Sequence, residues 1–447
     1  MIQMWCLISV VLLLASSKSI HMNHPRWGHS KALCVGGDGT NTSWHRTSCL
    51  YEDVCISSTN EFLIFDPHES LDIPSITVSL CILGIGGVAN RAAKVCKFAP
   101  TVIKSSILQY AKSTAWHMTP LVLFSNDEVP GFGHFIGDIV LPLYQIMHTH
   151  ALAITNVSFF KMNRSLKIGS FGTLTCDDVR NSKENKTELI HNNLYLVCQR
   201  NAIFFSKLFP YQIENMHTPT SSKSGGLICF EKVIAGIGYF SDHCNDASDH
   251  GKRLYGEEGG YKDHICNFGM AHMLRAFRDF VLLRINVIAP TLSLTKLRVL
   301  ISNDASWSRR KKHYKGWENI LNYVRDASLS WNTCVPVEVS HLNIMTSIQE
   351  QINDIYQAAV FVATSGSAAM ISVFLSDGAS RVIVYDTAGG SRVRKRDNNL
   401  FSHVYPSSTI WIPDRNRSHR ISYIPHVLRA TLTGLLRYCD YNRPSKK

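Results

Sequence analysis

The sequence predicts an α/β protein with two domains, and its length, composition and pattern of apolar runs all indicate this class. The chain has 447 residues, which is too long for one ordinary hydrophobic core. Hydrophobic residues make up 45% and charged residues 18%, a balance typical of globular proteins rather than disordered ones. Short apolar runs alternate with helical patterns along most of the chain, as they do in βαβ units.

Changes of composition along the chain predict the boundaries. In chain order we expect a signal peptide or signal anchor (1–17), a polar, turn-rich stem (18–47), a first α/β domain (48–290), a second α/β domain (291–425), and a C-terminal helix and tail packing back across the first domain (426–447). Within the first domain, the polar stretch 242–262 is expected to form a long surface loop.

The N-terminus predicts entry into the secretory pathway. Met4 to Ala15 form an apolar run of 12 residues, shorter than the ~20 residues of a membrane-spanning helix. Ala15, Ser16 and Ser17 offer the small residues of a signal-peptide cleavage site. The alternative is an uncleaved signal anchor, which would give a type II membrane protein. Either reading predicts the lumen of the Golgi or the endoplasmic reticulum.

The cysteine content indicates an oxidising compartment. Of the 13 cysteines, Cys6 lies in the leader, so an even number remains. Cys49 with Cys55, and Cys244 with Cys266, are candidates for local bridges, and buried free thiols are the alternative. Sequons for N-glycosylation occur at Asn41, Asn156, Asn163, Asn185 and Asn416.

His134 and Asp138 are the strongest catalytic candidates. An apolar run (119–124) and a Gly-rich turn precede a helical pattern that contains both residues. Because they are four positions apart, they share one face of a regular helix. An imidazole beside a carboxylate is a common way to hold a proton acceptor in place. An ordinary surface pair is the alternative for this spacing.

The second domain holds a candidate phosphate-binding turn. The apolar strand Ala359–Ala363 runs directly into Ser365, Gly366 and Ser367, whose small size permits close backbone approach before a helix opens. The amides at a helix N-terminus suit a pyrophosphate. A plain βα turn capped by Ser365 is the alternative.

Four further residues are candidates for donor binding. Arg309 and Arg310 begin a run of four basic residues after the strand at 299–301, and either guanidinium has the shape to bind a diphosphate. Glu350 and Gln351 lie one short helix before the turn at Ser365–Ser367, which is called the donor turn below. They are candidates to bind ribose or sugar hydroxyls. A solvated loop and a helix surface pair are the respective alternatives.

Charge and missing motifs narrow the function further. The formal net charge of +12 favours an anionic partner, and in the absence of a nucleic-acid motif the phosphates of a nucleotide sugar are the most economical one. A second basic run (392–396) is expected to lie in a solvent-exposed loop. The residues His243, Cys244, His250, His264 and Cys266 match no zinc pattern. The sequence contains no Asp-X-Asp, so no metal cofactor is expected. It also lacks hydrolase signatures.

The order of these segments resembles glycosyltransferase family 61, over most of residues 45 to 390. Ser48–Cys55 is similar to the early cysteine-framed segment of that family, which leads into a strand, here Glu61–Phe65. The segment around His134 looks like the histidine-containing helix start. Ile228–Gly236 and Phe277–Arg284 resemble the last strand and the crossover helix of the first domain.

The resemblance implies a GT-B fold, with two Rossmann-like domains facing a cleft, and inverting transfer of a pentose or N-acetylglucosamine from a UDP-sugar to a glycan or glycoprotein. It implies that Asp138 or His134 is the base. Where the family usually has His-Gly-Ala-Gly, this chain has Ser365-Gly366-Ser367-Ala368. That departure favours the alternative of a catalytically inactive relative that binds glycans or acts as a scaffold.

Overall fold

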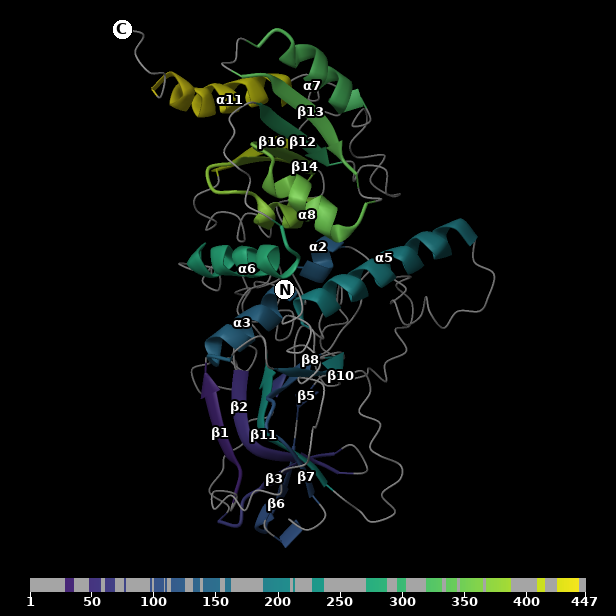
Figure 1. The fold of residues 1–447 in the computed structure, drawn as a ribbon, viewed down its shortest axis with the longest axis vertical. Helices are drawn as coiled ribbons and strands as arrows, with labels where there is room; N and C mark the ends of the chain where they lie inside the picture. Colours follow the sequence, from purple (N-terminus) through teal and green to yellow (C-terminus); the bar gives the residue numbers. More distant parts are fainter. Residues whose placement is uncertain are drawn as a thin grey trace, which may run out of the picture.

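The structure is a computed structural model, and it shows a mixed α/β protein (Figure 1). It describes residues 29–35, 48–57, 61–68, 76–77, 97–98, 100–107, 109–110, 114–124, 132–136, 140–152, 157–161, 188–209, 212–213, 227–236, 271–287, 296–302, 319–331, 335–343, 346–364, 367–386, 408–414 and 424–441. One β-sheet lies at each end of the long axis, and helices lie between the two sheets (Figure 1). The leader, the stem up to residue 28 and the predicted loop 242–262 fall outside the described residues.

The N-terminal sheet contains nine of the described strands. They are β1 (Lys31–Val35), β2 (Ser48–Ile56), β3 (Phe62–Phe65), β6 (Thr101–Ile103), β7 (Thr114–His117), β8 (Leu121–Phe124), β9 (Ser158–Lys161), β10 (Gln212–Ile213) and β11 (Leu227–Gly236). A separate antiparallel pair consists of β4 (Ile76–Thr77) and β5 (Lys97–Phe98). The strands β10, β9, β8 and β11 are parallel, whereas β2 is antiparallel to β1, β3 and β11. The sheet of this half is therefore mixed, whereas the Rossmann-like domain implied by the resemblance has a mostly parallel sheet.

Two long strands, β2 and β11, pair with each other along almost their whole length and form the spine of this sheet. On the side away from the other long strand, each of the two pairs with one strand over its first half and with a different strand over its second half. β2 pairs first with β1 and then with β3, and β11 pairs first with β7 and then with β8. Asp53 lies at the change on β2 and has a φ of 58°. Ser30 fixes the junction, because its hydroxyl donates to the carbonyl of Asp53 at 2.7 Å and accepts from the amide of Phe65 at 2.9 Å.

Two disulfides join directly opposed residues on neighbouring strands of this sheet. Cys34 on β1 is bonded to Cys49 on β2, and Cys55 on β2 is bonded to Cys229 on β11. The expected local bridge between Cys49 and Cys55 is therefore wrong. In an extended strand, residues six apart lie too far from each other for a disulfide, so each cysteine bonds across the sheet. Such bonds indicate an oxidising, secretory environment.

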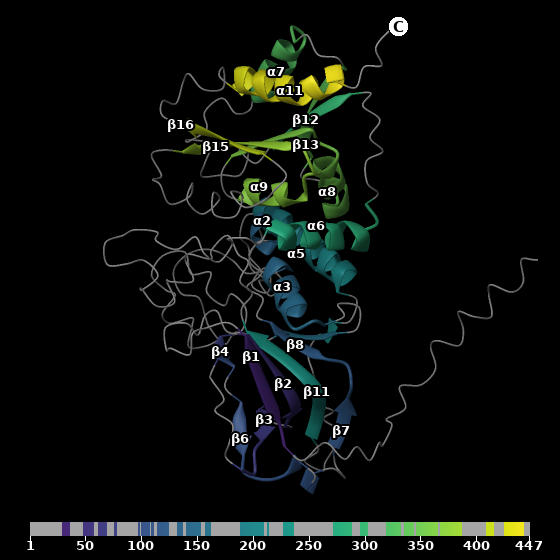
Figure 2. The ribbon, with the colours of Figure 1, turned by 90° about the vertical axis from the view of Figure 1, so that its left-hand side faces the viewer.

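The C-terminal sheet is fully parallel in its five described strands, which run in the order β13-β12-β14-β15-β16. They are β12 (Leu297–Ser302), β13 (Val337–Leu342), β14 (Val360–Thr364), β15 (Ser380–Asp386) and β16 (Ser408–Asp414). Helices α7 (Ile320–Ser328) and α11 (Ile424–Tyr441) lie on one side of the sheet. Helices α8 (Ile348–Tyr356) and α9 (Ser367–Met370) lie on the other (Figure 2). The strands predicted near 299 and 360 are thus present.

The C-terminal helix forms where the sequence predicted it, but it packs elsewhere. Three of its residues, Ile424, Leu428 and Leu432, are buried in one cluster with Val299 of β12 and Val324 of α7. Helix α11 contacts α7 on the outer side of the C-terminal sheet (Figure 1). The expectation that it packs back across the first domain is therefore wrong within the part of the helix whose side chains are described. Its apolar face is already buried on its own sheet.

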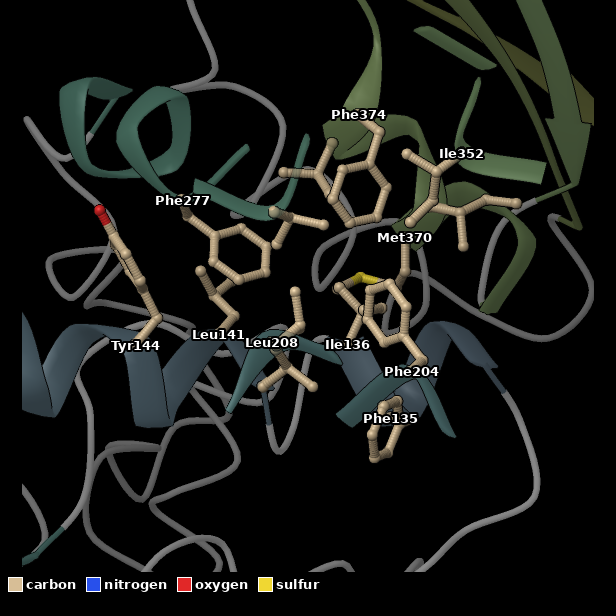
Figure 3. Packing of buried hydrophobic residues seen from close by; sticks show 14 of the residues in the cluster. Phe135, Ile136, Leu141, Tyr144, Phe204, Leu208, Phe277, Ile352, Met370 and Phe374 are labelled. Carbon is tan, nitrogen blue, oxygen red and sulfur yellow. The ribbon is translucent and has the colours of Figure 1, made fainter. Parts of the chain in front are cut away.

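The two halves share one continuous hydrophobic core. Helices α2 (Phe132–Phe135), α3 (Leu141–Thr149), α5 (Glu188–Leu208) and α6 (Ala271–Arg284) contribute from the N-terminal half, and α8, α9 and the 3-10 helix η10 (Ile371–Phe374) from the C-terminal half. Figure 3 shows Phe277 of α6 near Phe374 of η10, and the centroids of these rings are 6.1 Å apart. Apolar side chains therefore fill the described part of the boundary between the sheets.

Candidate active site

The order of strands in the C-terminal sheet marks one place where ligands commonly bind. After β12 the chain moves outward to β13 and then returns across the sheet to β14, so the direction of winding reverses between β12 and β14. In open parallel sheets, ligands bind outside the carboxyl ends of the strands at such a switch point. Here those ends are Ser302 of β12 and Thr364 of β14.

Four of the predicted donor residues come after these two strands in the sequence. Arg309 and Arg310 come after β12, and Ser365 and Gly366 come immediately after β14. These four residues lie outside the described part of the chain. Ser367 begins α9, which has four residues and continues into η10. Helix α9 is short, and its dipole is correspondingly weak.

The helix that carries His134 lies against the helix that follows the donor turn. Helix α2 contains His134, and it contacts α9, which begins at Ser367. Figure 2 shows α2 directly below α9. More than two hundred residues of sequence separate these segments. The fold therefore brings the candidate catalytic segment and the candidate donor segment together.

The helix in this region is not a regular α-helix. Ile136, which follows α2, and Val140, which precedes α3, are π-helical. π-Helical turns occur frequently at functional sites. His134 and Asp138 share one face only with regular α-helical spacing, and the π-helical Ile136 lies between them. The side chain of His134 and the whole of Asp138 are outside the described residues, so their mutual geometry stays a prediction.

Glu350 and Gln351 hold the start of helix α8. The Glu350 carboxylate accepts from the backbone amide of Ser347 at 2.9 Å, and the Ser347 hydroxyl accepts from the amide of Glu350 at 3.2 Å. These bonds form a capping box. The pKa of the exposed Glu350 carboxyl is lowered because the amide of Ser347 and its hydroxyl both donate to the carboxylate. The buried Gln351 donates to the carbonyl of Thr346 at 3.0 Å. The described contacts of both residues are thus structural, and their role in donor binding stays a prediction.

Sequence reasoning missed Arg278. This arginine lies on α6 among the buried residues Leu274, Val281, Leu282 and Ile285, and it is itself buried. Its guanidinium reaches into the C-terminal half, where it donates to the carbonyl of Leu375 at 3.0 Å. A signal was present in the sequence, because Arg278 interrupts an apolar stripe with helical spacing.

Two other features of the sequence fall outside the described residues. They are the basic run 392–396 and the histidines and cysteines between 243 and 266. Among the described residues, no group of three or more His, Cys, Asp or Glu side chains is placed to hold a metal ion. No helix in the described ranges is long and apolar enough to cross a membrane.

Comparison with protein-family models finds no match to this chain, and comparison with curated proteins finds none either. The likeness to family 61 therefore depends on the motifs in the sequence.

Proposed function

We propose that this protein is an inverting glycosyltransferase of the GT-B type that acts in the secretory pathway without a metal ion. Its donor is a UDP-sugar carrying a pentose or N-acetylglucosamine, and its acceptor is a glycan or glycoprotein. The cross-strand disulfides support a secretory location. The missing Asp-X-Asp motif supports the absence of a metal.

The contact between α2 and α9 carries this proposal. The donor turn follows β14 at the switch point of a parallel sheet, where phosphate-bearing ligands commonly bind. Helix α2, with His134, lies against the helix that leaves this turn. A base on α2 would therefore be near a sugar whose diphosphate is bound at Gly366. Glycosyl transfer needs this pairing of an acceptor base with a bound nucleotide sugar.

The proposed reaction is a single displacement. Asp138 or His134 takes the proton from an acceptor hydroxyl as its oxygen forms a bond to the anomeric carbon. The bond between that carbon and the phosphate oxygen breaks at the same time, and UDP leaves with the electron pair. Arg309, Arg310 and the amides near Gly366 stabilise the charge that develops on the diphosphate. Inversion follows because the hydroxyl attacks from the side opposite to UDP.

A catalytically inactive relative is the second candidate. The turn reads Ser365-Gly366-Ser367-Ala368, with one glycine and no histidine, where the family usually has His-Gly-Ala-Gly. The described contacts of Glu350 and Gln351, which serve the cap of α8, are consistent with this alternative as well. Such a protein would keep the fold and bind glycans or act as a scaffold without binding a nucleotide.

Thermal stabilisation by nucleotides distinguishes the two candidates. We expect UDP or one UDP-sugar to raise the melting temperature of the purified protein, with GDP-sugars as controls and with the same shift in EDTA. At a concentration 100 times the Kd, a ligand of the native state adds about 2.7 kcal/mol to the free energy of unfolding. Absence of a shift with every nucleotide, for a protein that unfolds cooperatively, would support the inactive relative.

The base is tested by His134→Ala and Asp138→Ala. For the residue that acts as the base, we expect kcat to fall at least about 100-fold, because general base catalysis typically contributes that much or more. Stabilisation by UDP should remain, because neither side chain is proposed to bind the nucleotide. Sugar transfer that persists in the double variant would show that the base lies elsewhere.

A further inference from the structure

Arg278 links the two halves of the molecule at the segment that follows the donor turn. From α6 of the N-terminal half, one nitrogen of its guanidinium donates to the carbonyl of Leu375 at 3.0 Å and to the carboxylate of Asp377 at 2.6 Å. Another nitrogen donates to the carboxylate of Asp279 on the same helix at 2.9 Å. The guanidinium also lies over the ring of Tyr356, 5.9 Å from its centroid.

The segment that Arg278 holds is short and continuous with the donor turn. It begins with α9 at Ser367, continues through η10 and ends at Leu375 and Asp377. Its first part contacts α2, and its second part contacts α6. Both of these helices belong to the N-terminal half. The backbone that leaves the donor turn is therefore held at its two ends by the opposite half of the protein.

Because Arg278 is buried, its guanidinium depends on the groups that it binds, and its planar shape fixes their orientation. Its side chain is 9% exposed, and burial in an apolar stripe would penalise an unpaired charge. Burial alone would lower the pKa of Arg278, but hydrogen bonds to Asp377 and Asp279 raise it above its ordinary value. A planar guanidinium with several donors fixes the orientation of the groups that it binds, which a lysine ammonium does not do. A small shift of the segment that follows η10 would separate this charge from Leu375 and Asp377 and leave Asp279 as its hydrogen-bonded carboxylate.

We propose that Arg278 is a positioning residue that fixes the donor turn from the N-terminal half of the protein. The proposal rests on the proposed function, because it assumes that the turn at Ser365–Ser367 binds a nucleotide. Arg278 itself is not a catalytic residue. It acts through Leu375 and Asp377 on the backbone of η10 and α9, and so couples the half that holds the acceptor base to the half that holds the donor.

Two matched variants separate positioning from a general effect on stability. Asp377→Asn and Asp279→Asn each remove one negative charge from the Arg278 guanidinium, and the two carboxylates are similarly exposed, at 50% and 56%. Asp377→Asn also weakens an ion pair with Arg275 of α6, at 3.7 Å, which is a second contact from the N-terminal half. Only Asp377 lies in the C-terminal half. We expect Asp377→Asn to raise the Kd for UDP about fivefold and Asp279→Asn to leave it within about twofold, since exposed pairs contribute little to overall stability. Both melting temperatures should change little and equally.

Amide hydrogen exchange of peptides covering residues 364–377 gives a readout that needs no nucleotide. In this segment Asp377→Asn should exchange faster than the wild type, and Asp279→Asn should not. Arg278→Lys keeps the charge but loses the planar fork, so its exchange and Kd should resemble those of Asp377→Asn. Equal exchange in all four proteins would overturn the positioning role, whether or not UDP binds. If Asp377→Asn exchanges faster than the wild type but the wild type binds no nucleotide, the mechanical link is retained and the proposed function is contradicted.

If UDP binds the wild type and both aspartate variants equally well, the positioning role is wrong and the proposed function stands.

Discussion

Replacing Cys55 and Cys229 with alanine is expected to lower the free energy of unfolding by about 5 kcal/mol, against about 3 kcal/mol for the same change at Cys34 and Cys49. The first bond closes a loop with a sequence separation of 174 residues, and the second closes one of 15. Closing the longer loop removes more conformational entropy from the unfolded chain. The two loops do not overlap, so the two effects should be independent.

The position of each bond adds to this difference. Cys55 and Cys229 are both fully buried and pack with Phe65, Ile107 and Leu227. Of the other pair, only Cys49 is buried, and Cys34 lies on the exposed edge strand β1. Alanine at the buried pair therefore also leaves a small cavity. The measurement is urea unfolding of the two double variants, monitored by circular dichroism in the absence of reductant. Peptide mapping under non-reducing conditions checks the pairing first.

Equal midpoints for the two double variants would contradict this account of the disulfides. A wild-type midpoint for Cys55→Ala with Cys229→Ala would do the same. The slope of the transition provides a further check, because an unfolded chain without the long loop exposes more surface, and the m-value should rise.

Asp53→Asn is expected to stabilise the protein above neutral pH and to have little effect near pH 4. Asp53 is buried on β2, and desolvation raises the pKa of its carboxyl to about 7, with the nearby charges of Glu52 and Glu231 adding to the rise and Lys31 opposing it. The protonated form is thus favoured in the folded state. The unfolded carboxyl has its ordinary pKa of 3.8. Stability from this group is therefore present below about pH 4 and is lost as pH rises through about 7.

The difference between the two pKa values sets the size of the effect. It corresponds to about 4 kcal/mol as an upper value, since one pKa unit equals about 1.4 kcal/mol. Asparagine keeps the shape of the side chain and tolerates the positive φ of 58° at this position, so the backbone should not be strained. The stability of the variant relative to wild type should therefore increase steadily between pH 4.5 and pH 8.

Measuring the difference between variant and wild type at each pH cancels the contributions of other groups. These include His117, His150 and His341, whose pKa values burial lowers and whose protonation destabilises the fold as pH falls. Glu52→Gln is the control, because it removes a neighbouring carboxylate on the same strand and should show only a small part of the effect. A stability difference for Asp53→Asn that does not change with pH would contradict the burial of an ionisable carboxyl at this site.

Local pattern in the sequence was enough to locate many of the elements. The apolar runs predicted the strands now seen as β12 and β14, and helical spacing predicted α11. The family resemblance indicated the segments now seen as β3, β11 and α6. The predictions from local pattern succeeded because the periodicity that distinguishes a strand from a helix is contained in neighbouring residues. The count of cysteines likewise indicated an oxidising compartment.

The tertiary structure alone decided how these elements meet. The strand order of the C-terminal sheet, the antiparallel pairing of β2 and the partners of Cys49 and Cys55 all depend on residues far apart in the chain. So do the contact of α2 with α9 and the reach of Arg278 to Leu375. Strand pairing and helix packing depend on residues that are far apart in the chain. Local sequence pattern therefore predicts where the elements lie but not which elements they contact.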